Sequence, residues 1–200
     1  MQIREVFDRK RFVFLDGGMG TQLQARGLQP GQKPELAALE MPEVLTAIHT
    51  DYANAGADIL LANTFGANAK KLTGCGHTVE EVVSASIACA RKAADITGAC
   101  VALDIGPLGE LLVPAGTLAF EDAYKEFAQV IRAGAAAGAD LVFLETMTDL
   151  YELKAAILAA RENCDLPVFT SMSFESRGRT FTGCTVESYA VTAAGLGADA

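Results

Sequence analysis

Gly56-Ala57-Asp58, Gly138-Ala139-Asp140 and Gly197-Ala198-Asp199 repeat one short pattern at three points of this 200-residue chain. Each of the first two triplets stands between a segment with helical periodicity and a short apolar run that is typical of a buried strand. Glycine is favoured just past the end of a helix, so the triplet marks a helix end that leads into a strand. The repetition predicts alternating helices and strands, and the third triplet predicts a sixth strand that would start where the sequence ends.

Outward from these triplets, five apolar runs are predicted as strands, and most are apolar throughout, as parallel strands covered on both faces are. They are residues 12–15, 58–62, 100–103, 141–144 and 167–171. Three helices are predicted from apolar residues that recur at helical spacing. Their stripes are Val44, Ile48, Tyr52 and Ala55; Phe120, Tyr124, Phe127 and Ile131; and Leu150, Leu153, Ile157 and Ala160. Thr78 with Glu81, and Asp149 with Glu152, have the spacing of capping boxes at helix starts.

Alternating strands and helices favour a parallel sheet with crossover helices. Five such units exceed a mononucleotide-binding half but fall short of an eight-stranded barrel, which usually takes about 250 residues. We therefore predict an α/β fold, a (βα)8 TIM-type barrel truncated to about its first five units, with residues 1–200 as one domain that is incomplete at its carboxyl end. The competing architecture is an open doubly wound sheet. Against it, polar residues follow every strand, whereas such a sheet concentrates them at one crevice.

Composition narrows the class of protein. Half of the residues are hydrophobic and the formal net charge is -9, with Lys and Arg scattered along the chain, which argues against nucleic acid as a partner. The amino-terminal segment from Met1 shows no targeting signal, and no apolar run approaches the roughly 20 residues of a membrane span, so we expect a cytoplasmic protein without a membrane partner.

The cysteines are widely spaced and include no Cys-x-x-Cys pair. This pattern argues against a disulfide framework and against a metal site within this chain, and it predicts small buried thiols. The residues are Cys75, Cys89, Cys100, Cys164 and Cys184.

Polar residues and glycines follow each predicted strand, at residues 16–21, 63–66, 104–107, 145–146 and 171–173. In a parallel barrel these positions meet at one mouth. Carboxylates beside hydroxyls and glycine-rich turns suit a small zwitterion, because acids pair with its ammonium group while amides and hydroxyls receive its carboxylate.

Two of these motifs have competing interpretations. The glycines after Asp16 also fit a phosphate cradle, although the run lacks the Lys-Ser/Thr of a P-loop, and they also fit a tight turn with no further role. Glu145 follows an apolar run, where a structural salt bridge would satisfy a buried carboxylate. His49 and His77 are weaker candidates, because neither accompanies a Ser or Cys nucleophile.

Four motifs, in this order along the chain, resemble the homocysteine S-methyltransferase family. They are Asp16-Gly-Gly-Met-Gly-Thr21, Leu61-Ala-Asn-Thr-Phe-Gly-Ala-Asn68, Asp104-Ile-Gly-Pro-Leu-Gly-Glu110 and Leu144-Glu-Thr-Met-Thr-Asp149. The resemblance spans essentially the whole chain, and its opening segments look most like the amino-terminal homocysteine domain of cobalamin-dependent methionine synthases. It implies methyl transfer to the thiol of homocysteine, which gives methionine.

The resemblance also implies roles for individual residues. Asp16 and Glu145 match the acids that hold the homocysteine amino group, and Gly17 and Thr64 match the contacts of its carboxylate. Supporting positions are Gly18, Gly20, Asn63 and Asp104. Cys184 stands where many relatives have a hydroxyl residue.

In the family, three cysteines after later strands bind zinc, which stabilises the homocysteine thiolate. Neither of their segments is present here, so we expect no metal ligand in this chain. We expect these 200 residues alone to lack methyl transfer and to bind homocysteine weakly or not at all. The resemblance implies methylcobalamin as the methyl donor of the full protein, with folate- and cobalamin-binding domains as partners, while betaine or S-methylmethionine serves relatives.

Two other functions fit parts of the sequence. A barrel lyase or aldolase for a small carboxylic acid would use Asp16, Asp104 and Glu145 as acid–base or divalent-metal groups, although no lysine or histidine joins them. A noncatalytic barrel fragment that self-associates through exposed strand edges is the other alternative.

Overall fold

The computed structural model describes residues 3–200, and its centre is a four-stranded parallel sheet in the order β1-β2-β3-β4. The strands are β1 (Ile59–Leu61), β2 (Cys100–Ile105), β3 (Leu141–Met147) and β4 (Val168–Met172). A doubly wound sheet reverses its strand order at a crevice, whereas this order follows the chain throughout. The prediction of an α/β fold with a parallel sheet is confirmed, and the doubly wound alternative is wrong.

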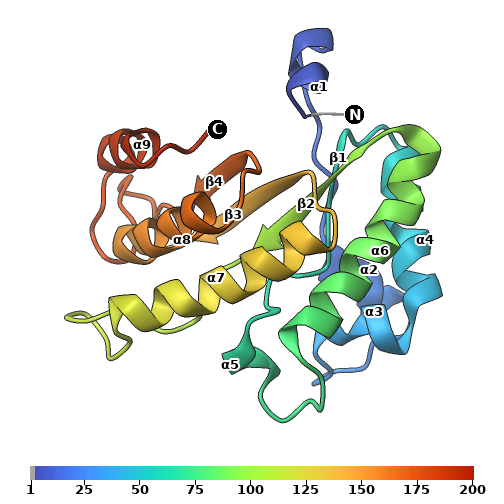
Figure 1. Ribbon diagram of the computed structural model, residues 1–200, viewed down its shortest axis with the longest axis horizontal. Helices are drawn as coiled ribbons and strands as arrows, with labels where there is room; N and C mark the ends of the chain where they lie inside the picture. The colour runs from blue at the N-terminus through green and yellow to red at the C-terminus, as the bar shows by residue number, and fades with distance from the viewer. Residues whose placement is uncertain (1–2) are drawn as a thin grey trace.

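Helices connect the strands and flank the sheet (Figure 1). They are α1 (Ile3–Arg9), α2 (Met19–Ala25), the short 3-10 helix η1 (Pro34–Leu36), α3 (Ala37–Glu40), α4 (Pro42–Asn54), α5 (Ala69–Leu72), α6 (Val79–Thr97), α7 (Phe120–Ala136), α8 (Leu150–Asn163) and α9 (Val186–Gly195). The first two residues of the amino-terminal segment, where we expect no targeting signal, lie outside the described part.

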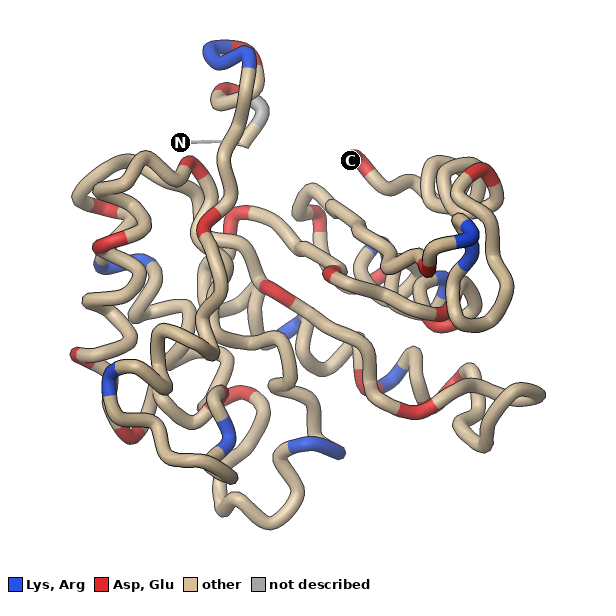
Figure 2. The backbone as a smooth tube through the Cα atoms, turned by 180° about the vertical axis from the view of Figure 1, so that it is seen from behind, with Lys and Arg blue, Asp and Glu red and all other residues tan. Residues whose placement is uncertain are grey.

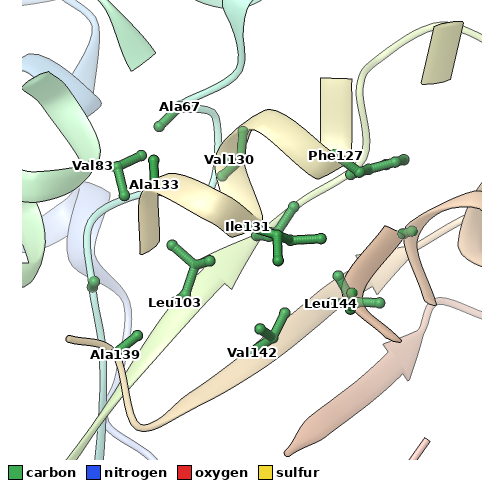
Figure 3. Close-up of a cluster of buried hydrophobic side chains, with 14 of the residues drawn as sticks. Ala67, Val83, Leu103, Phe127, Val130, Ile131, Ala133, Ala139, Val142 and Leu144 are labelled. Carbon is green, nitrogen blue, oxygen red and sulfur yellow. The ribbon is translucent and has the colours of Figure 1, made fainter. Parts of the chain in front are cut away.

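The main core lies between the sheet and the helices α6, α7 and α8. Successive residues of a strand point to opposite faces, so alternate side chains of β2 and β3 meet the helices. Leu103, Val142 and Leu144 are fully buried there against Phe127 and Ile131 of α7 (Figure 3). The predicted stripe on α7 is thus confirmed, with Phe120 and Tyr124 partly buried against the same core.

The opposite face of the sheet carries the intervening residues. Near the amino ends of the strands, this face packs against α1 in a separate apolar cluster. That cluster consists of Ile3, Val6, Ile59, Cys100, Ala102 and Leu141. Towards the carboxyl ends, the same face carries Asp104 of β2 and Glu145 of β3. Alternate residues of a strand share a face, and these two lie two residues after Ala102 and four residues after Leu141. The strand period therefore delivers two carboxyl groups to one side of the sheet.

The predicted strand at residues 12–15 is wrong as a regular strand, and the sheet has four strands rather than five. Leu15 forms only an isolated parallel bridge with Ile59. The carbonyl of Phe14 accepts from the N–H groups of Asp58 and Ile59, at 2.7 and 3.2 Å. The N–H of Phe14 donates to the side chain of Asp58 at 3.0 Å. The N–H of Asp16 donates to the carbonyl of Ile59 at 3.0 Å, so the segment pairs with β1 at this one bridge and forms no longer ladder.

The glycine of each repeated triplet has a left-handed backbone, with φ of 103° at Gly56, 88° at Gly138 and 91° at Gly197. This conformation confirms the prediction of a glycine just past a helix end. After the third triplet, the N–H of Thr170 donates to the carbonyl of Ala200 at 2.8 Å, so the last residues run along β4. The third triplet therefore precedes a strand-like pairing, as the other two do.

The predicted helix starts are partly right. Thr78 and Glu81 form the full capping box. Asp149 caps α8 through its carboxylate, but Glu152 does not return to the cap, since its carboxylate accepts the N–H of Leu108 at 2.7 Å. On α4 the stripe is wrong at Ala55, which is exposed because the helix ends at Asn54.

No helix among residues 3–200 is long and apolar enough to cross a membrane. Lys and Arg positions are dispersed over the chain (Figure 2). The cysteines of the described part form no disulfide; two are buried and three are half-buried, so the prediction of buried thiols is right for only part of the set. Cys89 and Cys100 are the buried ones, and Cys75, Cys164 and Cys184 are half-buried.

Candidate functional site

A cavity of about 480 Å³ opens at the carboxyl ends of β1, β2 and β3. Its wall comes from segments that follow different strands, together with the η1 region. The lining residues are Asp16, Gly17, Gly18, Met19, Gly20, Pro34, Glu35, Leu61, Ala62, Asn63, Phe65, Asp104, Glu145 and Thr146. The structure thus brings together all the predicted site residues except Thr64, while their individual contacts with a ligand stay predictions.

Three carboxyl groups dominate the charge of this cavity. Burial, together with a smaller contribution from the nearby Glu145, raises the pKa of Asp16 from 3.8 to about 7, although the N–H of Leu61 donates to Asp16 Oδ2 at 3.0 Å and opposes the shift. Burial raises the pKa of Asp104 well above its ordinary value, with added repulsion from Glu145 and Asp16. Burial also raises the pKa of Glu145. Each group would ionise more readily beside a cation.

The cavity wall supplies no such cation, because its described lining includes no Lys or Arg. The Oδ1 atoms of Asp16 and Asp104 are buried without a hydrogen-bond partner in the described part of the chain. Buried acceptors without donors are costly, so they favour a ligand that brings N–H groups. An ammonium group brings both the charge and three donors.

His49 and Tyr52 of α4 stand behind the glycine run. The sequence marks His49 only as a weak candidate and does not link Tyr52 to the site. His49 is fully buried, with Nδ1 3.9 Å from Asp16 Oδ2, and burial lowers its pKa from 6.5 to about 4, so the imidazole is neutral at pH 7. The Tyr52 hydroxyl donates to the carbonyl of Gly18 at 3.1 Å. The helical stripe placed Tyr52 on the core face, but no local pattern linked it to the glycines.

Thr64 lies beneath the cavity wall. Its buried hydroxyl donates to the carbonyl of Asp104 at 2.7 Å and accepts the N–H of Asp104 at 3.1 Å. These bonds hold the end of β2 beside the segment after β1. The prediction that Thr64 contacts a ligand carboxylate stays a prediction, and the observed contacts give it a role in placing Asp104.

Asn63 ties a further segment to the site, since its side-chain amide donates to the carbonyl of Pro34 at 2.6 Å. This bond brings Pro34 and Glu35 of η1 into the wall. The carboxyl group of Glu35 is the fourth in the cavity lining, and sequence reasoning missed it. It also missed Met19, Phe65 and Thr146. All three lie in segments that were predicted to follow strands, but none of them was singled out as a site residue.

The backbone of Thr146 is left-handed, with φ of 58°, at an irregularity in the pairing of β3 with β4. Non-glycine residues rarely adopt this conformation, and when they do they cluster at functional sites. The N–H of Thr146 donates to Ser171 Oγ at 2.8 Å. Ser171 therefore supports the wall from outside the cavity lining.

Among residues 3–200 no group of three or more His, Cys, Asp or Glu side chains is placed to bind a metal. The cavity wall contributes oxygen groups and no thiol. Cys184 lies instead at a separate hollow beside Asp149 and Thr182.

Residues 13–200 match the sequence model of the family described as homocysteine S-methyltransferase, so the chain belongs to the homocysteine S-methyltransferase family. The predicted family resemblance is confirmed. Curated relatives include methionine synthase of Mycobacterium tuberculosis, strain ATCC 25618 / H37Rv, at 33% identity, and that of Mycobacterium leprae, strain TN, at 32%. Both alignments cover 95% of this chain, which spans only 17% of the length of either relative.

Solved structures show the same fold. The oxidized form of the Escherichia coli homocysteine methyltransferase MmuM aligns with a TM-score of 0.87 at 22% identity, over 97% of this chain and 73% of that one. Its metallated form aligns with a TM-score of 0.87 at 23% identity, over 98% of this chain and 74% of that one. The family match does not favour the lyase or aldolase alternative.

Proposed function

We propose that this chain supplies the amino-acid recognition half of a methyltransferase site, in a protein that transfers a methyl group to the thiol of homocysteine and forms methionine. The observation that carries the proposal is the convergence of Asp16, Asp104 and Glu145 on one cavity without a lysine or arginine in its described lining. Family membership supports the reaction class.

Binding of an amino-acid zwitterion follows from these groups. An ammonium ion among the three carboxyl groups offsets their mutual repulsion and lowers their pKa values, so the acids ionise as the ligand binds. Gly17 is proposed to meet the ligand carboxylate from the glycine run. Met19 and Phe65 give the wall an apolar part that suits the methylene chain of homocysteine.

Methyl transfer needs more than recognition. A free thiol has a pKa of about 8.5 and is mostly protonated at neutral pH, while only the thiolate is a good nucleophile. We propose that the activating zinc is held by family cysteines outside these 200 residues, in a complete (βα)8 barrel of which residues 1–200 are the incomplete homocysteine domain. Alone, the chain is proposed to bind homocysteine weakly and to lack methyl transfer. Methylcobalamin and the folate- and cobalamin-binding domains are proposed partners in the complete protein.

Recognition can be tested by nitrogen-15 NMR titration of the chain with L-homocysteine under reducing conditions, since NMR detects weak binding. The amides of Gly17, Gly18 and Gly20 are expected to shift. The same compound without its amino group, 4-mercaptobutanoic acid, is expected to bind at least about tenfold more weakly, because the carboxyl groups lose their cation.

A matched pair of variants sharpens the titration. Glu145→Gln is expected to weaken homocysteine binding by about tenfold, whereas Glu187→Gln, at an exposed position on α9, is expected to leave it unchanged. Equal shifts with both compounds, shifts away from the cavity, or no shift at all would contradict the proposal.

A further inference from the structure

Two charged side chains from different elements hold one peptide group in the loop after β2. Lys71 Nζ of α5 donates to the carbonyl of Pro107 at 2.7 Å. The N–H of Leu108 donates to the carboxylate of Glu152, in the first turn of α8, at 2.7 Å. This carbonyl and this N–H belong to the same peptide bond, so the two side chains bind both hydrogen-bonding groups of one peptide.

We call this arrangement of Lys71 and Glu152 around Pro107–Leu108 the peptide bracket. Its formation costs free energy because both charged groups are taken out of water. Glu152 is only 2% exposed, and burial raises its pKa from 4.5 to about 7 despite the bond from Leu108. Burial likewise lowers the pKa of the half-buried Lys71, against the opposing charges of Glu35 and Glu152. Charged pairs in such surroundings add little stability compared with apolar packing, so stability alone does not account for them.

The bracket is linked to the cavity through Gly106 and Phe65. The N–H of Gly106 donates to the carbonyl of Phe65 at 3.0 Å. The Phe65 ring lies against Gly106 so closely that a Cβ at Gly106 would be 2.4 Å from Cζ of the ring. Lys71 Nζ also stands 5.6 Å from the centre of the same ring. Because of these contacts, the position of the loop after β2 and the position of the Phe65 ring depend on each other. Phe65 in turn lines the cavity.

We propose that Lys71 and Glu152 are positioning residues for the cavity. By fixing the Pro107–Leu108 peptide, they set the place of the Phe65 ring and of the end of β2 that carries Asp104. Neither residue lines the cavity, so they act through the loop and not on the ligand. The identity of the ligand rests on the proposed function, whereas the position of the loop can be measured without any ligand.

The first test is amide hydrogen exchange of the 200-residue chain, followed by NMR. In Glu152→Ala and in Lys71→Met, the amides of Gly106 and Leu108 are expected to exchange about tenfold faster, and the Phe65 ring signals to shift. The amide of Ile131 in α7 is expected to stay protected. Glu152→Gln keeps an oxygen acceptor for Leu108 and is expected to restore slow exchange.

Lys154→Met is the matched control for Lys71→Met. Lys154 also stands over an aromatic ring, 5.9 Å from the centre of Phe120, but it does not bond the loop after β2. It is expected to leave Gly106 and Leu108 unchanged. Unchanged exchange in Glu152→Ala, an equal effect in Lys154→Met, or an equal loss of protection at Ile131 would each overturn the proposal.

The second test is the affinity for L-homocysteine, measured by the same titration. Glu152→Ala is expected to weaken it by about tenfold and Glu152→Gln to restore it. An unchanged affinity despite faster loop exchange would overturn the link to the cavity. If the parent chain does not bind homocysteine, the proposed function fails, while the exchange experiment still decides whether the bracket positions the loop.

Discussion

Among the glycines that line the cavity, Gly17 has the least room for a side chain. A Cβ placed there would lie 2.9 Å from Cε1 of Tyr52, whereas one placed on Gly20 would meet no atom within 4 Å. The glycine run therefore serves a close approach by Tyr52 at one position and leaves room at another. Neither the phosphate cradle nor the tight turn accounts for this difference.

Gly17→Ala is expected to destabilise the chain by about 1–3 kcal/mol, because either the ring or the backbone must move. Gly20→Ala is the matched control, and it is expected to be neutral or to stabilise by at most about 1 kcal/mol, since Gly20 lies within α2. Urea unfolding followed by circular dichroism measures both. Equal free energies of unfolding for the two variants would show that the contact with Tyr52 is unimportant.

Asp16 makes stability depend on pH. Its pKa rises from 3.8 to about 7 on folding, so between these values the folded chain holds a proton that the unfolded chain has lost. This contribution to the free energy of unfolding is present at low pH and is lost as the pH rises towards 7. The contribution of His49 to the pH dependence of stability has the opposite sign. Burial lowers its pKa from 6.5 to about 4, so stability falls as the pH drops through that window.

Asp16→Asn is expected to remove the Asp16 contribution together with the repulsion that Asp16 exerts on Asp104. The variant should be more stable than the parent at pH 8, and the difference should shrink or reverse by pH 5. Thermal unfolding at the two pH values measures this change. The exposed Asp95→Asn serves as the control, and a parent-to-variant difference that does not change with pH would refute the assignment.

At the scale of the element, the repeated triplets share a double hydrogen bond. The N–H of Asp140 donates to the carbonyl of Val101 at 2.8 Å, and its carboxylate accepts the N–H of the same residue at 2.7 Å. Asp199 pairs with Val168 in the same way, and Asp58 with Phe14. Each aspartate also meets a cation. These are Lys10 for Asp58, Arg91 for Asp140 and Arg161 for Asp199.

Asp140→Ala is expected to cost about 1–3 kcal/mol, because it leaves the N–H of Val101 without its charged acceptor at the start of β2. Asp165→Ala, at an exposed position between α8 and β4, is the control and is expected to change stability little. The comparison uses urea unfolding. A loss no greater than that of the control would mean that the double bond does not stabilise the strand start.

Over the whole molecule, large apolar side chains are exposed towards both ends of the chain and also in its middle, where Ile96 is 70% exposed. Phe12 and Phe14 are 64% and 62% exposed, and Phe181 and Val191 are 71% and 74% exposed. Exposed apolar surface of this kind favours association, so we expect the 200-residue chain to associate with itself. Such association would also cover the outer edges of β1 and β4, the two edge strands of the sheet.

Extension of the chain with the carboxyl-terminal part of a family barrel is expected to cover these surfaces and to add the zinc cysteines. The extended chain should contain zinc, catalyse methyl transfer to homocysteine and sediment as a monomer, whereas the 200-residue chain should do none of these. Metal analysis, a methyl-transfer assay and sedimentation velocity measure the three properties. A folded extended chain without zinc would contradict the proposal.

The sequence by itself determined the alternation of strands and helices, the glycine ends of the helices, the family, and the convergence of Asp16, Asp104 and Glu145. The alternation and the glycine ends depend on residue spacing within one segment, and the family on four motifs in order. The convergence follows because the carboxyl ends of parallel strands meet at one edge of the sheet. Tertiary structure alone decided that Thr64 bonds Asp104, that Glu152 bonds Leu108 instead of its own cap, and that residues 12–15 pair at a single bridge. In each case the partners lie far apart in sequence, so the choice depended on distances that no local pattern contains.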